Sequence, residues 1–190
     1  MAENKSEKMF LSHYLPAFLA SAILLIIIII LYTNILAMTD DHFVYALDDA
    51  YIHIAISENL IENGNYGPTP YAFETASSSI IWNFFFVGNF LITGVSISVP
   101  FILNVILGVL TIFALQKILL SWLPDRTNLL YTLVLIAFIF FIPLPTMIFT
   151  GMEHNLQILI SILVVYFAVE LLTADDDYSI KAFKYALAIS

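Results

Sequence analysis

The chain has 190 residues, of which 61% are hydrophobic and only 11% are charged, and its formal net charge is −9. Because a soluble domain carries about 25% charged residues, this composition predicts an integral membrane protein. The acidic balance argues against a nucleic-acid partner, since the chain offers no basic surface that could neutralise phosphates. The sequence contains no cysteine, which excludes disulfides, thiolate catalysis and cysteine-based zinc sites.

The first long apolar segment predicts a membrane-spanning helix over residues 15–38. No charged residue stands between Met9 and Thr39, and a helix that rises about 1.5 Å per residue crosses about 30 Å of hydrocarbon within this length. Lys5 and Lys8 precede the segment, as basic residues do in signal peptides. The apolar run is longer than the core of a signal peptide and no small-residue cleavage site follows it. We therefore expect an uncleaved anchor.

Later apolar stretches predict an all-α bundle. Each is long enough to cross the bilayer or nearly so, and they are separated by short polar turns. The expected spans lie at 99–122, 129–149 and 156–173, and a further helix is expected over 180–190.

A shorter apolar stretch at 80–93 decides the topology. It is too short for an ordinary span and is interrupted by Asn83. Its Trp82 suits the level of the lipid headgroups. If it enters the bilayer and returns, every Lys and Arg falls on one side of the membrane, as the positive-inside rule requires. We therefore expect a cytoplasmic amino terminus, an extracytoplasmic loop over residues 39–98 with helices lying at the interface, and a location in a cell (inner) membrane.

Two adjacent acids, Asp48 and Asp49, stand at the start of a predicted helix in this loop. The sequence "ENGNYG" ends that helix, and Gly64 suits a left-handed position after its last turn. The pair is explained either by helix capping with solvated surface charge or by a functional role. One carboxylate suffices for a cap, so the second is unexplained, and the loop has no basic residue to neutralise it. Unneeded acids at a membrane edge are candidates for function.

Three further polar residues each have a structural and a functional interpretation. His53 lies one helical turn after Asp49, so it either contacts lipid headgroups or takes part in metal binding or a proton relay. Glu153 and His154 follow Gly151 at the start of another predicted helix. A carboxylate there is favoured by the helix dipole, so capping and a functional role both remain open.

Three ordered motifs resemble a known family. They are "DDAYIHIAISENLIENGNYG" at 48–67, "ASSSIIW" at 76–82 and "TGMEH" at 150–154. Around spans of the expected sidedness, they resemble the amino-terminal part of the GT-C membrane glycosyltransferases, over about residues 10–175. The resemblance implies a multi-span helical bundle whose first extracytoplasmic loop carries juxtamembrane helices.

The resemblance also implies an activity, the transfer of a sugar from a polyprenyl-phosphate donor to a glycan, lipid or protein acceptor at the extracytoplasmic face. In this family Asp48 matches the general base. Asp49 would orient the acceptor or ligate a divalent cation, the one cofactor implied, and Glu153 matches the family's second acidic position. The remaining residues expected to contact substrate are His53, Ser78, Trp82 and His154.

Two departures keep an alternative open. Many relatives hold the donor phosphate with a Lys or Arg in the outer loops, and here none stands between Lys8 and Lys117. The family has many more spans, so we expect this chain to be incomplete and to work with a remaining carboxy-terminal part. The alternative is a non-catalytic membrane subunit, or a membrane protein whose acidic outer loop binds divalent cations.

Overall fold

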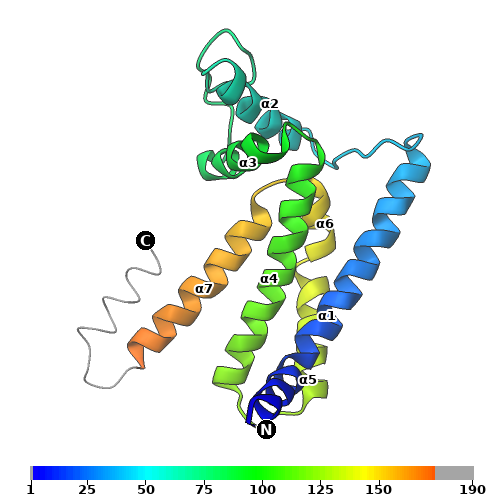
Figure 1. Cartoon of the computed structure of the whole chain (residues 1–190), viewed down its shortest axis with the longest axis vertical. Helices are drawn as coiled ribbons and strands as arrows, with labels where there is room; N and C mark the ends of the chain where they lie inside the picture. Colours follow the sequence, from blue (N-terminus) through cyan, green and yellow to red (C-terminus); the bar gives the residue numbers. More distant parts are fainter. Residues whose placement is uncertain (1, 174–190) are drawn as a thin grey trace.

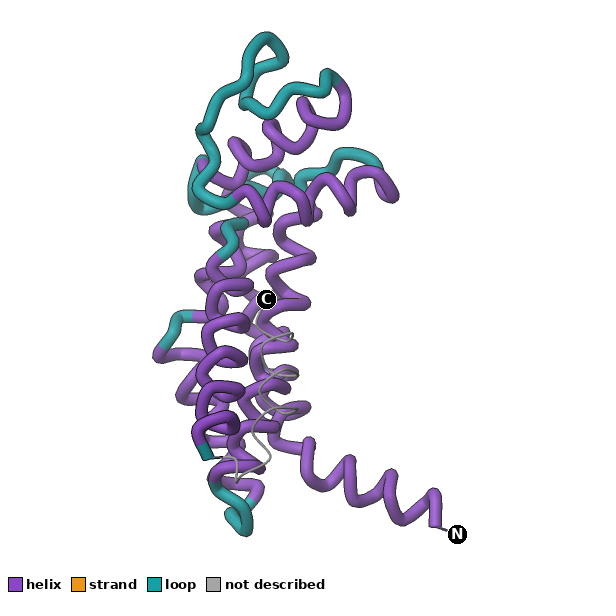
Figure 2. Tube along the Cα trace, turned by 90° about the vertical axis from the view of Figure 1, so that its left-hand side faces the viewer, coloured by secondary structure: helices purple, strands orange, loops and turns teal. Residues whose placement is uncertain are grey.

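The computed structural model describes the backbone of residues 2–173 and the side chains from Ser12 onward. The helix expected over 180–190 lies outside the described residues. Within the described part the protein is all-helical, with seven helices and no strand (Figures 1 and 2). The helices are α1 (Ala2–Met38), α2 (Asp49–Glu62), α3 (Ile80–Thr93), α4 (Ser98–Trp122), α5 (Asn128–Phe141), α6 (Leu144–Thr150) and α7 (His154–Leu172).

Three of these helices are long and apolar enough to cross a membrane, namely α1 over Ser12–Met38, α4 and α7. The uninterrupted span expected at 129–149 is not continuous, because α5 and α6 form a pair bent by 43°. Pro143 stands at the break and Pro145 follows it in the first turn of α6. Because proline has no backbone N–H, it removes helical hydrogen bonds and favours a kink. The protein is therefore a helical membrane protein with one broken apolar helix pair.

The bundle forms around contacts of α1 with α5 and α4, and of α4 with α7. Its core contains Leu24, Ile112, Leu135 and Ile148 from four different helices, and all four are fully buried. At Gly108 a Cβ atom would lie 3.4 Å from Ile148 Cδ1 and 3.5 Å from Leu24 Cδ2. The missing side chain allows these helices to approach closely, as small residues do between membrane helices.

A buried amide pair joins α4 to α7. Asn155 Nδ2 donates to Asn104 Oδ1 at 2.9 Å, and neither residue is exposed. Asn104→Leu would leave that donor unpaired, and we expect it to lower the free energy of unfolding by about 1–2 kcal/mol. Thermal unfolding in detergent would measure the change. The double variant Asn104→Leu/Asn155→Leu should recover part of the loss, and a double variant less stable than the single would contradict this reading.

Two hydrogen bonds fix the arrangement of the helix ends. Gln116 Nε2 donates to the carbonyl of His13 at 2.8 Å, and Asn128 Nδ2 donates to the carbonyl of Ser12 at 3.1 Å. The beginning of the apolar part of α1 therefore lies beside the last turns of α4 and the start of α5. The helices α2 and α3 pack on each other across the opposite end of the bundle (Figures 1 and 2).

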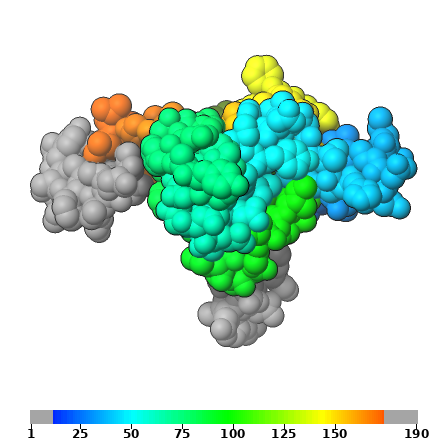
Figure 3. All heavy atoms as spheres, turned by 90° about the horizontal axis from the view of Figure 1, so that it is seen from above, coloured from blue at the N-terminus to red at the C-terminus, as the bar shows by residue number. Residues whose placement is uncertain are grey.

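We call residues 49–93 the α2–α3 unit; seen from above, it covers the middle of this end of the bundle (Figure 3). Its apolar side consists of Trp82, Phe86 and Phe90, which form a buried cluster with Val99 of α4. The rings of Trp82 and Phe86 lie 4.9 Å apart. The expectation that Trp82 sits among lipid headgroups is wrong, because Trp82 is fully buried against the bundle.

Candidate functional site

A buried tyrosine fixes the segment that leads into α2. The hydroxyl of Tyr45 donates to the carbonyl of Ile97 at 2.5 Å and accepts from the backbone N–H of Phe101 at 2.9 Å. Burial raises the pKa of Tyr45 well above its ordinary value, so the hydroxyl keeps its proton. One residue later, the N–H of Ala46 donates to the carbonyl of Phe149 at 3.0 Å. The start of α2 is therefore held on the bundle by two independent contacts.

The adjacent acids Asp48 and Asp49 stand at the first turn of α2, and both are exposed. Asp48 occupies the N-cap position, but its side chain makes no capping hydrogen bond. Capping therefore does not explain this residue. In the described part of the chain neither carboxylate has a hydrogen bond or an ion pair, so both are free to meet a ligand from outside.

His53 points the other way and is 1% exposed. Its Nδ1 atom lies 2.6 Å from Asn83 Oδ1, and Asn83 Nδ2 donates to the hydroxyl of Tyr66 at 2.8 Å. Because the amide of Asn83 presents its oxygen to the ring, Nδ1 carries the proton and donates it. The second ring nitrogen, Nε2, is thereby left facing the bundle. The expected contact of His53 with lipid headgroups is wrong.

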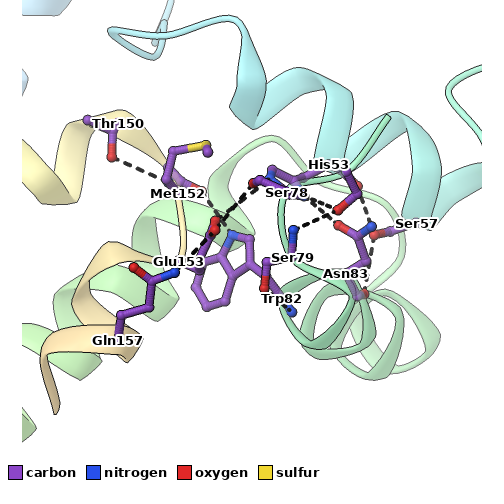
Figure 4. A network of polar contacts seen from close by, with 12 residues as sticks. His53, Ser57, Ser78, Ser79, Trp82, Asn83, Thr150, Met152, Glu153 and Gln157 are labelled. Atoms are coloured by element: carbon purple, nitrogen blue, oxygen red, sulfur yellow. Dashed lines mark hydrogen bonds and ion pairs between the residues drawn. The ribbon is translucent and has the colours of Figure 1, made fainter. Parts of the chain in front are cut away.

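Glu153 meets His53 at the junction between the α2–α3 unit and α7 (Figure 4). The residue is 4% exposed, and its Oε2 atom lies 3.8 Å from His53 Nε2. Its Oε1 atom accepts from Ser78 Oγ at 3.2 Å and from Gln157 Nε2 at 3.4 Å. Ser78 Oγ also lies 3.3 Å from His53 Nε2. Glu153 stands at the N-cap position of α7, but its side chain makes no capping hydrogen bond.

Trp82 of α3 fixes the turn before α7 through a hydrogen bond. Its indole Nε1 donates to the carbonyl of Gly151 at 3.1 Å. Gly151 has φ of +69°, and a Cβ atom there would come within 2.8 Å of Tyr45 ring atoms and 2.7 Å of Ala50 Cβ. Only glycine fits a left-handed backbone position with so little space. The turn thus brings Glu153 under the α2–α3 unit.

His154 lies apart from this network. It is half-buried and lines an open cavity of about 500 Å³ between the α5–α6 break and α7, together with Met147, Gln157 and Ser161. A metal site at Asp49 also finds no support in the structure. Among residues 12–173, whose side chains are described, no group of three or more His, Asp or Glu side chains could hold a metal ion.

The structure therefore brings together four of the seven residues singled out from the sequence: His53, Ser78, Trp82 and Glu153. It leaves Asp48 and Asp49 exposed at the start of α2. His154 lines the cavity between the α5–α6 break and α7. Sequence reasoning missed the partners that complete the network, namely Ser57, Tyr66, Ser77, Asn83 and Gln157. The available signal was an amide, Asn83, within an otherwise apolar helix, where a polar group needs a partner.

The molecule thus has two carboxylate sites of opposite character at one end of the bundle. One consists of Asp48 and Asp49, which are exposed and make no side-chain hydrogen bond or ion pair within residues 12–173, and the other is the buried Glu153 in a hydrogen-bonded network. Comparison of the chain with protein-family models, curated proteins and solved structures found no match. A functional conclusion therefore rests on the chemistry of these residues.

Proposed function

We propose that this protein, or a larger enzyme of which it forms the amino-terminal part, is a GT-C-type glycosyltransferase. In this proposal a sugar moves from a polyprenyl-phosphate donor to a hydroxyl of a glycan, lipid or protein acceptor at the extracytoplasmic face. Asp48 is the general base. The observation that carries the proposal is the exposure of Asp48 and Asp49 at the edge of an apolar helical bundle. Neither carboxylate has a partner among the residues that the structure describes.

The position of this pair suits a lipid-linked donor. The bundle is apolar enough to lie in a bilayer, and the tail of a polyprenyl donor would lie beside it with its phosphate at the interface. The sugar–phosphate bond would then reach the level at which the long helices end. The α2–α3 unit lies at that level (Figure 1). Asp48 stands directly before it and Asp49 is its first residue.

The reaction requires one proton acceptor. Asp48 would take the proton from the acceptor hydroxyl as that oxygen attacks the anomeric carbon. The bond between the anomeric carbon and the phosphate oxygen breaks at the same time, so polyprenyl phosphate leaves with the bonding electrons and the configuration inverts. Asp49 would orient the acceptor. Glu153 is buried and bonded to Ser78, so we assign it to positioning α2 rather than to contact with the acceptor.

The test is Asp48→Asn in the full-length protein, reconstituted in proteoliposomes with a panel of polyprenyl-phosphate sugars. Asparagine keeps the size of the side chain but cannot accept the proton, so we expect the release of polyprenyl phosphate to fall about 10²–10⁴-fold.

Asp41→Asn is the matched control, because Asp41 is an exposed acid of the same loop with φ of 62°, a conformation that asparagine tolerates. This control should retain the parent rate. Release by Asp48→Asn at the parent rate would refute the base assignment, and a wild type that releases no polyprenyl phosphate from any donor would refute the transferase.

A further inference from the structure

We propose that a cavity at the end of the bundle opposite the α2–α3 unit binds the headgroup of an ethanolamine phospholipid, which carries a phosphate diester and a primary amine. The cavity has a volume of about 270 Å³. Its polar lining comes from α1, from the loop 123–127 between α4 and α5, and from α5: Ser12, His13, Asp125, Arg126, Asn128 and Tyr131. The inference does not depend on the proposed transferase activity, because Asp48 and Asp49 stand at the other end of the bundle (Figure 1).

The cavity lies where three apolar helices begin or end. Ser12 is the first residue of the candidate span in α1, Trp122 is the last residue of α4, and Asn128 is the first residue of the α5–α6 pair. Membrane helices end at the boundary between hydrocarbon and headgroups, where tryptophan and tyrosine are enriched. The cavity is therefore at the level at which a lipid beside the bundle presents its phosphate.

Hydrogen bonds to the backbone fix the walls of the cavity. Tyr131, which is 3% exposed, donates its hydroxyl to the carbonyl of Leu123 at 2.6 Å. The same hydroxyl accepts from the N–H of Arg126 at 3.4 Å. The two hydrogen bonds from α4 and α5 to the start of α1 fix the wall that α1 contributes. The cavity is thus a formed feature of the fold, and a ligand need not order the loop when it binds.

Two adjacent side chains of opposite charge, Asp125 and Arg126, line the cavity without pairing with each other. Both residues are exposed, and neither side chain makes a hydrogen bond or an ion pair with any residue of the described part. A guanidinium binds a phosphate through two parallel N–H···O bonds, and a carboxylate accepts hydrogen bonds from an ammonium group. The wall therefore offers one partner for each charge of a zwitterionic headgroup.

The same two charges discriminate among lipids. A headgroup whose only charge is its phosphate would leave Asp125 without a partner and close to a like charge, which disfavours that lipid. A choline headgroup has a positive charge but no N–H to donate to the carboxylate. Ethanolamine supplies both charges and the donors on a short link. Pockets for drug-sized ligands measure about 300–1,000 Å³, so the smaller cavity suits a group of this size.

The general distribution of charge at a membrane boundary does not account for this arrangement. Basic residues gather on one side of a membrane protein, which suffices to explain Arg126 and the exposed Lys117. It does not explain an acid in the wall of the same cavity. Lys117 does not line the cavity, so it provides a matched control for Arg126.

The test measures lipid binding by the purified full chain in detergent, with native mass spectrometry as the readout. Phosphatidylethanolamine, phosphatidylglycerol and phosphatidylcholine with identical acyl chains would each be titrated against the protein. We expect the dissociation constant for phosphatidylethanolamine to be at least about tenfold lower than the other two, because losing a hydrogen bond to a charged group weakens binding by about tenfold or more. Equal constants for the three lipids would overturn the proposal.

Asp125→Asn removes the partner of the amine. Asp125 has φ of 65°, a conformation that asparagine tolerates, so the loop should keep its shape. We expect the variant to bind phosphatidylethanolamine about tenfold more weakly and to lose the preference over phosphatidylglycerol. Asp41→Asn, at a residue with φ of 62° near the other end of the bundle, should bind as the parent does. A preference that survives in Asp125→Asn contradicts the proposal.

Arg126→Gln removes the partner of the phosphate. We expect it to weaken the binding of phosphatidylethanolamine and of phosphatidylglycerol alike, by about tenfold, whereas Lys117→Gln should bind both lipids as the parent does. Unchanged affinity in Arg126→Gln is incompatible with the site. Both substituted residues are exposed, and thermal unfolding without lipid checks that each variant folds. Should one of them fail to fold, the outcome stated for the other decides.

Glycerophosphoethanolamine, the same headgroup without acyl chains, distinguishes a membrane lipid from a soluble ligand. Acyl chains beside the apolar helices bury surface that the soluble compound lacks, so we expect glycerophosphoethanolamine to bind at least about tenfold more weakly than the lipid. Equally tight binding of the two would exclude a membrane lipid as the ligand of this cavity.

Discussion

Replacing Gly151 by alanine is expected to destabilise the folded protein by roughly 3 kcal/mol. The residue has φ of +69°, which costs any other L-residue about 1–2 kcal/mol. The new methyl group would also lie 2.7 Å from Ala50 Cβ and 2.8 Å from the ring of Tyr45, and overpacking of this kind costs about 1–3 kcal/mol. Urea unfolding of the detergent-solubilised protein, followed by tryptophan emission, would measure the loss.

Gly64→Ala separates the two contributions. Gly64 has φ of +67°, nearly the same as Gly151, but nothing lies within 4 Å of its Cβ position. This control should show only the backbone cost, about 1–2 kcal/mol. Equal losses at the two positions would mean that the close contacts between Gly151 and the start of α2 do not hold the α2–α3 unit in place.

Trp82→Ala is expected to lower the free energy of unfolding by about 3–5 kcal/mol, the usual cost of truncating a large buried aromatic side chain. The ring is fully buried between α3 and the bundle, and its N–H is the hydrogen-bond donor to Gly151 O. Trp82→Phe keeps most of the packing but leaves that carbonyl without this donor, so a smaller loss of about 1–3 kcal/mol is expected. Thermal unfolding followed by circular dichroism would rank the variants.

Trp122→Phe is the matched control, because Trp122 is 43% exposed at the end of α4. It should change stability by no more than about 0.5 kcal/mol. If Trp82→Ala were as mild as this control, the buried cluster of Trp82, Phe86 and Phe90 would not be what fixes α3 to the bundle.

Several local features of the fold could be predicted from short stretches of the sequence. The apolar runs predict α1, α4 and α7 because hydrocarbon requires about 20 consecutive residues without charge, and this property belongs to the segment alone. Gly64 adopts the expected left-handed conformation because the geometry of a helix end is likewise local. The break between α5 and α6 was missed, although Pro143 and Pro145 mark it, because proline within an apolar span is tolerated when neighbouring groups satisfy the backbone.

The candidate functional site could be predicted only in part from the sequence. His53 and Glu153 were singled out individually as polar residues near a membrane edge, and Ser78 was named only through the resemblance to GT-C enzymes. Their mutual contacts join residues 25 and 75 positions apart in the chain. No local pattern encodes such pairing. The burial of Trp82 was predicted wrongly for a similar reason, because an aromatic residue beside an apolar segment suits either a lipid headgroup or a protein core.

By itself the sequence determined that this is a helical membrane protein, since hydropathy and helix propensity act over short stretches of chain. It also determined that the segment 39–98 contains several acids and no Lys or Arg. The tertiary structure alone decided which of them are paired. It left Asp48 and Asp49 in solvent and enclosed Glu153 with His53, because the hydrogen-bond partners of a buried group are supplied by whichever helices pack around it.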